Sequence, residues 1–103
     1  MPAAPVTVMI IYHAQPGRGA AAGTALAALI ATVQEREPDC HGIALLQDVA
    51  DDTRFLLYER WASQAAYTGP HMRTPHIQAF IRGATDLFTG PPEITFWREP
   101  SGR

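Results

Sequence analysis

The sequence predicts one α+β domain over residues 1–103, with the element order β-α-β-β-α-β. Three observations carry this prediction. Four short segments are rich in β-branched and aromatic residues, which is typical of strands. Two longer segments carry apolar residues at helical spacing. The second and third strand segments are separated by only four residues, which permits a hairpin but no crossover connection.

The first half of the chain contains a strand and the longer helix. Residues 6–14 form the first predicted strand, and Pro16 and Gly17 end it. Residues 20–37 form the predicted helix, and Pro38 stops it. The apolar stripe of this helix consists of Leu26, Leu29, Ile30 and Val33.

Three further strands follow. Residues 41–49 and 54–61 are predicted to pair as an antiparallel hairpin, and residues 93–98 form the last strand. Together with the first strand they make a four-stranded antiparallel sheet. With two main helices on one face, this is the ferredoxin-like arrangement.

The sequence between the third and fourth predicted strands contains two signals for the start of a helix. Residues 62–68 can form a short helix with Ser63 as its cap. Thr74 followed by Pro75 is a strong start signal for the second main helix, because threonine caps a helix and proline suits its first position.

Both faces of the predicted strands are apolar. In the first strand, Val8 and Ile10 point to one face while Met9 and Ile11 point to the other. The helices can cover only one of these faces, and a large bare apolar face is not tolerated on a monomer. We therefore expect a second copy of the chain to cover the other face, in an isologous homodimer.

The composition argues against nucleic-acid and membrane partners. Eight basic residues, all arginine, stand against ten acidic residues, and the net charge is −2. Scattered arginines form no basic patch for DNA or RNA, and no apolar run approaches the length of a bilayer span. A single cysteine, Cys40, excludes an internal disulfide, and no signal peptide is evident. We therefore expect a cytoplasmic protein.

Two adjacent segments carry a family resemblance. They read Tyr-Glu-Arg-Trp-Ala-Ser-Gln-Ala-Ala-Tyr at residues 58–67 and His-Met-Arg-Thr-Pro-His-Ile-Gln-Ala-Phe at residues 71–80. A strand that ends in Glu-x-Trp, a short helix with an aromatic residue and a His-x-x-Thr-Pro-His segment resemble the antibiotic biosynthesis monooxygenase family, including its small quinol-monooxygenase-like members. The resemblance extends from about residue 6 to residue 97 and implies a dimeric α/β barrel.

The resemblance also implies an activity, the oxidation of an electron-rich phenol or hydroquinone to a quinone by dioxygen. The implied partners are a small aromatic substrate and dioxygen, with no flavin, haem, metal or other cofactor. A phenolate can pass an electron to dioxygen far more easily than a neutral phenol can. The site must therefore bind a flat ring, take a proton, stabilise an anion and exclude water.

Three residues are candidates for catalysis. A base that works near neutral pH is most simply a histidine, and His71 and His76 flank the start of the last helix. Tyr67 can stack on a ring or donate a hydrogen bond. Each has a structural alternative: His71 as a surface loop residue, His76 as a partner of helix N-terminal groups, and Tyr67 as the apolar face of the short helix.

Four residues are candidates for substrate binding. Trp61 can stack on an aromatic ring, Arg82 can steady an anion if it faces inward, and Glu59 and His13 lie on the strands. The alternatives are a packing role for Trp61, a structural role for His13 and a solvated Arg82. Glu59 alternates with apolar residues, so it can also hold an arginine or a histidine in a partly buried region.

Competing motifs are weaker. Residues 17–22 fit the dinucleotide-binding pattern G-x-G-x-x-A, but the hairpin after the next strand leaves no parallel sheet, so we interpret the glycines as turn residues. His71 and His76 have no third ligand, so we predict no metal site. A haem-degrading relative would need an asparagine, which the chain lacks, and a tryptophan near Pro70.

Two other functions stay open. The chain could be a small-molecule-binding or stress-related dimeric module without turnover, since the same pocket would serve. It could also be a non-oxidative isomerase acting on small sugar-derived signals. A polar pocket would favour the isomerase, whereas a dry aromatic pocket would count against it.

Overall fold

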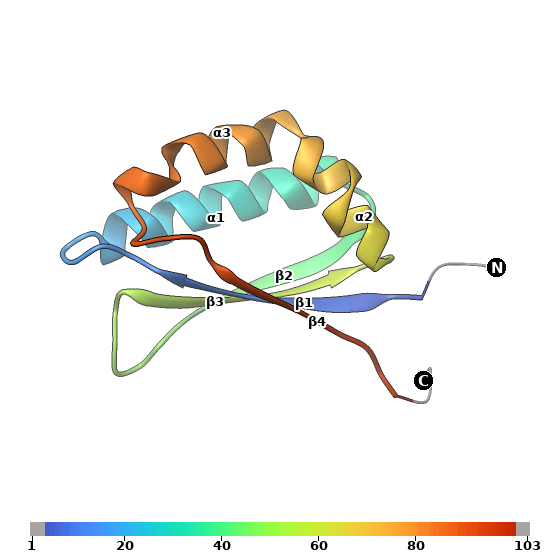
Figure 1. The fold of residues 1–103 in the computed structure, drawn as a ribbon, viewed down its shortest axis with the longest axis horizontal. Coiled ribbons are helices and arrows are strands. Elements are labelled where there is room, and N and C mark those ends of the chain that lie inside the picture. The colour runs from blue at the N-terminus through green and yellow to red at the C-terminus, as the bar shows by residue number, and fades with distance from the viewer. Residues whose placement is uncertain (1–3, 101–103) are drawn as a thin grey trace.

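The structure is a computed structural model, and it describes residues 4–100. Its elements are β1 (Val6–His13), α1 (Gly19–Arg36), β2 (Cys40–Gln47), β3 (Arg54–Trp61), α2 (Gln64–Thr68), the 3₁₀ turn η1 (Pro70–Arg73), α3 (Pro75–Gly83), the 3₁₀ turn η2 (Ala84–Asp86) and β4 (Glu93–Trp97). All three α-helices lie on one face of the sheet (Figure 1). Within this part of the chain, no helix has both the length and the apolarity needed to cross a bilayer.

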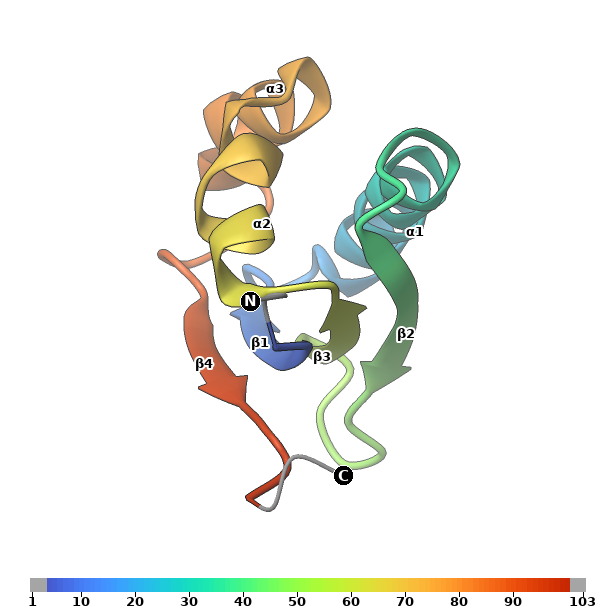
Figure 2. The same cartoon turned by 90° about the vertical axis from the view of Figure 1, so that its right-hand side faces the viewer.

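The sheet has the strand order β2-β3-β1-β4, and every neighbouring pair is antiparallel. Ile10 at the centre of β1 stands opposite Leu57 of β3 and Ile94 of β4. Figure 2 shows α1 above the β2 side of the sheet and α3 above the β4 side. The predicted α+β, ferredoxin-like fold is confirmed.

Both predicted caps are confirmed. The Ser63 hydroxyl accepts a hydrogen bond from the Ala66 N–H over 3.0 Å, and the Thr74 hydroxyl accepts one from the Ile77 N–H over 3.4 Å. Pro75 is the first residue of α3. These contacts satisfy helix N–H groups that have no partner within the helix itself.

The ends of several elements differ from the prediction by one or two residues, and two differences involve turns. Strand β2 ends at Gln47 rather than at residue 49, because the Asp48 carboxylate accepts a hydrogen bond from the Ala50 N–H and closes a turn. Residues 70–73, predicted as loop, form the 3₁₀ turn η1, which runs directly from α2 into α3. This turn carries His71 into the interior rather than to the surface.

The core lies between the sheet and the helices. Val8 and Leu57 from the sheet and Leu26 and Val33 from α1 are almost completely buried there. The opposite side of the sheet, which we call the outer face, is also apolar, as predicted. Its large apolar side chains are Met9, Ile11, Leu46, Leu56, Tyr58 and Trp97. Leu46 and Trp97 remain about half exposed, at 51% and 57%.

Candidate active site

A cavity of about 420 Å³ lies between the sheet and α3. Its lining residues are Tyr12, Tyr67, Met72, Ile77, Phe80, Ile81, Ala84, Thr85, Phe88, Gly90, Pro91, Pro92 and Ile94. None of these residues is charged, and most are aliphatic or aromatic. Such a cavity suits an uncharged, largely apolar ligand.

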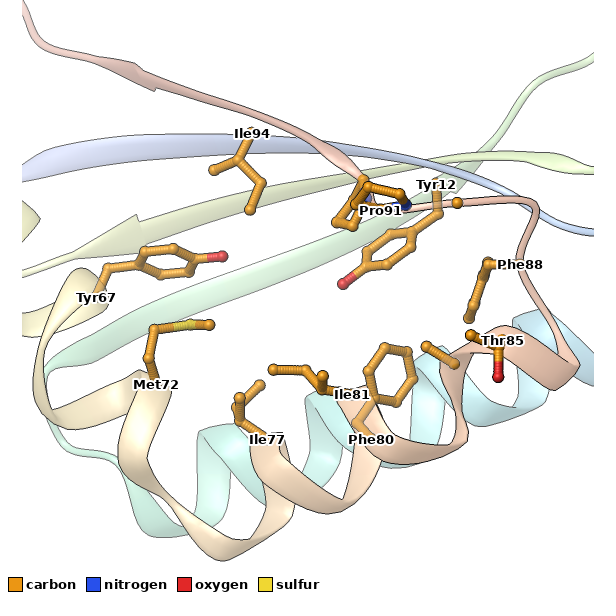
Figure 3. Close-up of a pocket in the computed structure, with 13 residues that line it drawn as sticks. Tyr12, Tyr67, Met72, Ile77, Phe80, Ile81, Thr85, Phe88, Pro91 and Ile94 are labelled. Atoms are coloured by element: carbon orange, nitrogen blue, oxygen red, sulfur yellow. The ribbon is translucent and has the colours of Figure 1, made fainter.

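Two tyrosines supply the polar groups that face into the cavity. Figure 3 shows the hydroxyls of Tyr12 and Tyr67 pointing toward one another from β1 and α2. Burial raises the pKa of both hydroxyls well above the ordinary value, and the nearby carboxyl of Glu59 raises it further. Both groups therefore stay protonated at neutral pH and can donate hydrogen bonds to a ligand.

The aromatic side chains around Tyr12 fix its ring. Phe88 lies 4.9 Å from it and Phe80 lies 6.0 Å from it, measured between ring centroids. Tyr12 was not among the predicted site residues. In the sequence, Tyr12 lies two residues after Ile10 and four after Val8, on the same face of the strand. This spacing is also that of a core residue, so it does not mark Tyr12 as a site residue.

His71 and His76 meet at one carboxylate, that of Glu37. His71 Nδ1 lies 2.9 Å and 3.0 Å from the two oxygens of Glu37, and His76 Nε2 lies 2.6 Å from Oε2. All three side chains are largely buried, so the surface-loop alternative for His71 is wrong. Glu37 was not predicted as a site residue, because it lies 34 residues before His71 in the sequence.

His71 also packs against the aromatic residues of the site. Its ring centroid lies 4.6 Å from that of Trp61 and 4.9 Å from that of Tyr67. Burial lowers the pKa of His71, although the hydrogen bond and the charge of Glu37 oppose this effect. Neither His71 nor His76 is among the residues that line the cavity. Of the three predicted catalytic residues, only Tyr67 reaches it.

Glu59 and Trp61 form a second buried pair. The indole N–H of Trp61 donates to Glu59 Oε1 over 2.8 Å, and both side chains are almost completely buried. Burial raises the pKa of Glu59 to about 7, the Trp61 hydrogen bond lowers it, and the charge of Glu37 raises it. Glu59 therefore bonds to Trp61 rather than to the arginine or histidine that the sequence suggested.

Two predicted substrate-binding residues lie apart from this group. His13 is exposed at the end of β1, and Arg82 is exposed on α3. Neither lines the cavity. Arg82 thus lacks the inward orientation on which its predicted role depended. In residues 4–100, no group of three or more histidine, cysteine or acidic side chains is arranged to hold a metal ion.

The arrangement combines an uncharged, largely apolar cavity, two hydroxyl donors and, packed against Tyr67, a buried imidazole that contacts a carboxylate. Hydroxyl donors in a low-dielectric cavity stabilise negative charge on a ligand oxygen more strongly than they would in water. The lining therefore fits a largely apolar molecule that carries an oxygen acceptor.

Comparison with solved structures supports the fold. PA3566 of Pseudomonas aeruginosa has a crystal structure that superposes with a TM-score of 0.84 at 29% identity, covering 96% of this chain and 97% of that one. Rv0793 of Mycobacterium tuberculosis superposes with a TM-score of 0.81 at 24% identity, covering 93% and 95%, which supports the fold alone.

A curated relative covers less of the chain. The uncharacterized protein sll1783 of Synechocystis is 32% identical over 62 residues, which are 60% of this chain and 42% of that protein. The chain thus spans less than half the length of that relative. The family model for antibiotic biosynthesis monooxygenases matches residues 5–83, which include β1 to β3 and all three α-helices. The chain therefore belongs to the antibiotic biosynthesis monooxygenase family.

Proposed function

We propose that the protein is a cofactor-independent monooxygenase that oxidises an electron-rich phenol or hydroquinone to a quinone with dioxygen. The observation that carries this proposal is the uncharged aromatic cavity into which Tyr12 and Tyr67 direct their hydroxyls. Family membership supports an oxygenase, and the cavity supports an aromatic substrate with oxygen substituents.

The proposed reaction balances without a further reductant. The phenol loses its proton, and the phenolate passes one electron to dioxygen. The radical pair recombines, so that one oxygen atom forms a bond to ring carbon and the O–O bond then breaks. The second oxygen atom leaves as water with two hydrogens from the substrate, so that a phenol becomes a quinone and a hydroquinone becomes a hydroxyquinone. The substrate supplies all the electrons.

Four residues of the site have assigned roles in the proposed reaction. Tyr12 and Tyr67 donate hydrogen bonds to the substrate oxygens and stabilise the phenolate. Neither histidine lines the cavity, and of the two we assign proton acceptance to His71, because its ring packs on Tyr67, which does line it. We assign His76 to the support of this imidazole through Glu37.

Oxygen uptake by the purified protein with a hydroquinone or an anthrone, followed by mass spectrometry after reaction under ¹⁸O₂, tests the proposal. One labelled atom is expected in the product. Tyr67→Phe and His71→Ala should each slow uptake tenfold or more, whereas His13→Ala, on an exposed residue outside the cavity, should not.

Ligand-dependent thermal stabilisation without oxygen uptake would overturn the proposal in favour of a binding module. Equal uptake by the wild-type protein, His71→Ala and His76→Ala would remove both histidines from the mechanism. The isomerase alternative is the less favoured one, because the residues lining the cavity carry no charge and few polar groups.

We also propose that the protein is a homodimer that buries the outer face. Leu46, Tyr58 and Trp97 are large apolar residues on that face and are 41–57% exposed. Burying such surface is favourable by about 25 cal/mol per Å². Light scattering at micromolar concentration should give twice the chain mass, and Leu46→Asp should give a monomer.

Val49 provides a matched control for this test. It is fully exposed in the turn after β2, outside the sheet. Val49→Asp should leave the dimer intact. A monomeric wild-type protein would overturn the proposed dimer.

A further inference from the structure

Glu37 joins three segments that are far apart in the sequence. It follows the last residue of α1, its backbone N–H donates to the Val33 carbonyl, and its side chain reaches η1 and α3. One carboxylate accepts hydrogen bonds from His71 of η1 and His76 of α3. The exposed fractions of the three side chains are only 4–12%, so this contact is shielded from water.

The carboxylate fixes the tautomer of each imidazole. An ionised carboxylate only accepts hydrogen bonds, so His71 Nδ1 and His76 Nε2 must both carry hydrogen. In the opposite tautomer of His76, Nδ1 would carry the hydrogen. That atom is buried and has no hydrogen-bond partner among the residues that the structure describes. An N–H placed there would lack an acceptor, which is costly in a buried position.

The contact continues from His71 to the cavity. The His71 ring lies 4.9 Å from the Tyr67 ring, and the two planes are inclined by only 31°. The Tyr67 hydroxyl points into the cavity (Figure 3). The Tyr67 ring also packs on Trp61 and Phe96, at 5.6 Å and 5.7 Å, and His71 is the nearest of these rings. A displaced His71 would therefore remove the closest of the rings that hold Tyr67 in place.

The same segments form the cover of the cavity. Residues 70–83, which carry both histidines, also carry Met72, Ile77 and Phe80, and these three side chains line the cavity. Glu37 does not line the cavity itself, and it holds this cover to the end of α1. Its carboxylate is the polar anchor between this cover and α1.

We propose that Glu37 is a positioning residue of the site: by holding His71 and His76 in fixed tautomers, it places the Tyr67 hydroxyl and the cover at residues 70–83 for ligand binding. This inference rests on the proposed function only in taking the cavity as the ligand site. Glu37 touches no ligand itself and acts through His71.

The variant Glu37→Gln tests this role, with Glu35→Gln as the control. Glu35 is exposed in the last turn of α1, two residues before Glu37, so its replacement removes the same charge without touching the histidines. The probe is a neutral 1,4-naphthoquinone, whose affinity is measured by titration calorimetry. We expect Glu37→Gln to weaken binding about tenfold and Glu35→Gln to leave it unchanged, because only the first variant frees His71.

Two spectroscopic readouts separate positioning from simple loss of stability. The groups that act on the charge of His71 are Glu37 and His76. Removing the carboxylate should lower the pKa of His71 further, as followed by NMR of its imidazole. The ring resonances of Tyr67 should shift in Glu37→Gln and not in Glu35→Gln, because the stacked imidazole moves.

A folded Glu37→Gln protein with unchanged Tyr67 resonances would overturn the inference, and so would unchanged naphthoquinone affinity. If Glu37→Gln fails to fold, the pair His76→Ala and His76→Gln decides. The alanine variant should weaken binding and the glutamine variant, which keeps an N–H near Nε2, should restore it. Equal affinity of His76→Ala and wild type would refute the role.

The two proposals fail in different ways. If the wild-type protein binds naphthoquinone but consumes no oxygen, the proposed function is wrong and the positioning role stands. If it binds no naphthoquinone, the proposed substrate class is wrong. The positioning role of Glu37 is then tested only by whether the Tyr67 resonances shift in Glu37→Gln.

Discussion

Trp61 donates its indole N–H to Glu59 over 2.8 Å, and both side chains lie on the buried face of β3. Residues two apart share one face of a strand, so the spacing itself brings them together. A carboxyl buried beside an indole is costly to ionise. Its burial is the main reason why the pKa of Glu59 rises to about 7.

Replacing Trp61 by phenylalanine should leave Glu59 without this donor. We expect the free energy of unfolding to fall by about 2–3 kcal/mol, because a buried acceptor loses its partner and the smaller ring leaves a void. The pKa of Glu59 should rise above about 7, since the Trp61 hydrogen bond lowers it. Urea denaturation and carboxyl NMR measure the two effects.

Trp97 offers a control with the same local geometry. Its indole N–H donates to the Thr95 hydroxyl over 2.8 Å, two residues earlier on β4, but on the exposed side of the sheet. Trp97→Phe should leave the pKa of Glu59 unchanged, because the Trp97 indole bonds to Thr95 rather than to Glu59. An unchanged pKa of Glu59 in Trp61→Phe would contradict the prediction.

Glu59→Gln should remove a pH dependence of stability. The pKa of Glu59 is about 7 in the folded chain and 4.5 is its ordinary value. Between these values the folded protein keeps a proton that the unfolded chain releases, so stability falls as the pH rises through this window. The shift corresponds to about 3 kcal/mol.

The free energies of unfolding of wild type and variant are compared at each pH, because the contributions of the other titratable groups then cancel. From pH 4 to pH 8, the free energy of unfolding of Glu59→Gln should rise relative to wild type by about 3 kcal/mol. The amide can still accept the Trp61 N–H, so the core hydrogen bond persists. Parallel pH profiles for the two proteins would show that Glu59 titrates normally.

Local patterns predicted most of the fold. The apolar residues on both faces of the strands predicted the outer face, and Ser63 and Thr74 predicted the starts of α2 and α3. These signals are short-range, because strand alternation and helix capping depend on neighbours within a few residues. The family resemblance is carried by residues 58–67 and 71–80, and the need for a base and a ring-binding residue pointed to His71, His76 and Tyr67 within them.

The remaining features depend on packing between distant segments. Glu37 meets His71 only because η1 turns inward and α3 packs beside α1, and neither event has a local signal. Tyr12 follows the same alternation as the core residues Val8 and Ile10. Alternation predicts on which face of the strand a side chain lies. It does not predict whether that side chain packs against another side chain or lines a cavity.

Tyr12→Phe should weaken ligand binding with little effect on stability. The change removes one hydroxyl that faces the cavity and keeps the ring that packs on Phe88. A lost hydrogen bond of about 1 kcal/mol corresponds to roughly fivefold weaker binding of a naphthoquinone. Tyr58→Phe, on the outer face, should bind as the wild type does. Equal affinities of all three proteins would exclude Tyr12 as a ligand donor.

Gly19→Ala should destabilise the fold, for a reason unrelated to nucleotide binding. Gly19 belongs to the segment that fits the dinucleotide-binding pattern, and it begins α1. A Cβ atom at this position would lie 2.6 Å from the Asp52 carbonyl oxygen in the β2–β3 turn. The backbone of one segment would have to move, which should cost about 1–3 kcal/mol.

Gly83→Ala is a control for the general effect of replacing a helical glycine by alanine. It distinguishes that effect on stability from the effect of the close approach at Gly19. It ends α3, and a Cβ atom there would meet nothing within 4 Å. Gly83→Ala should therefore leave the protein as stable or raise its stability by up to about 1 kcal/mol. Urea denaturation of the two variants gives the comparison. If Gly19→Ala were as stable as Gly83→Ala, contact with the β2–β3 turn could not explain the glycine, and a ligand at the start of α1 would again need consideration.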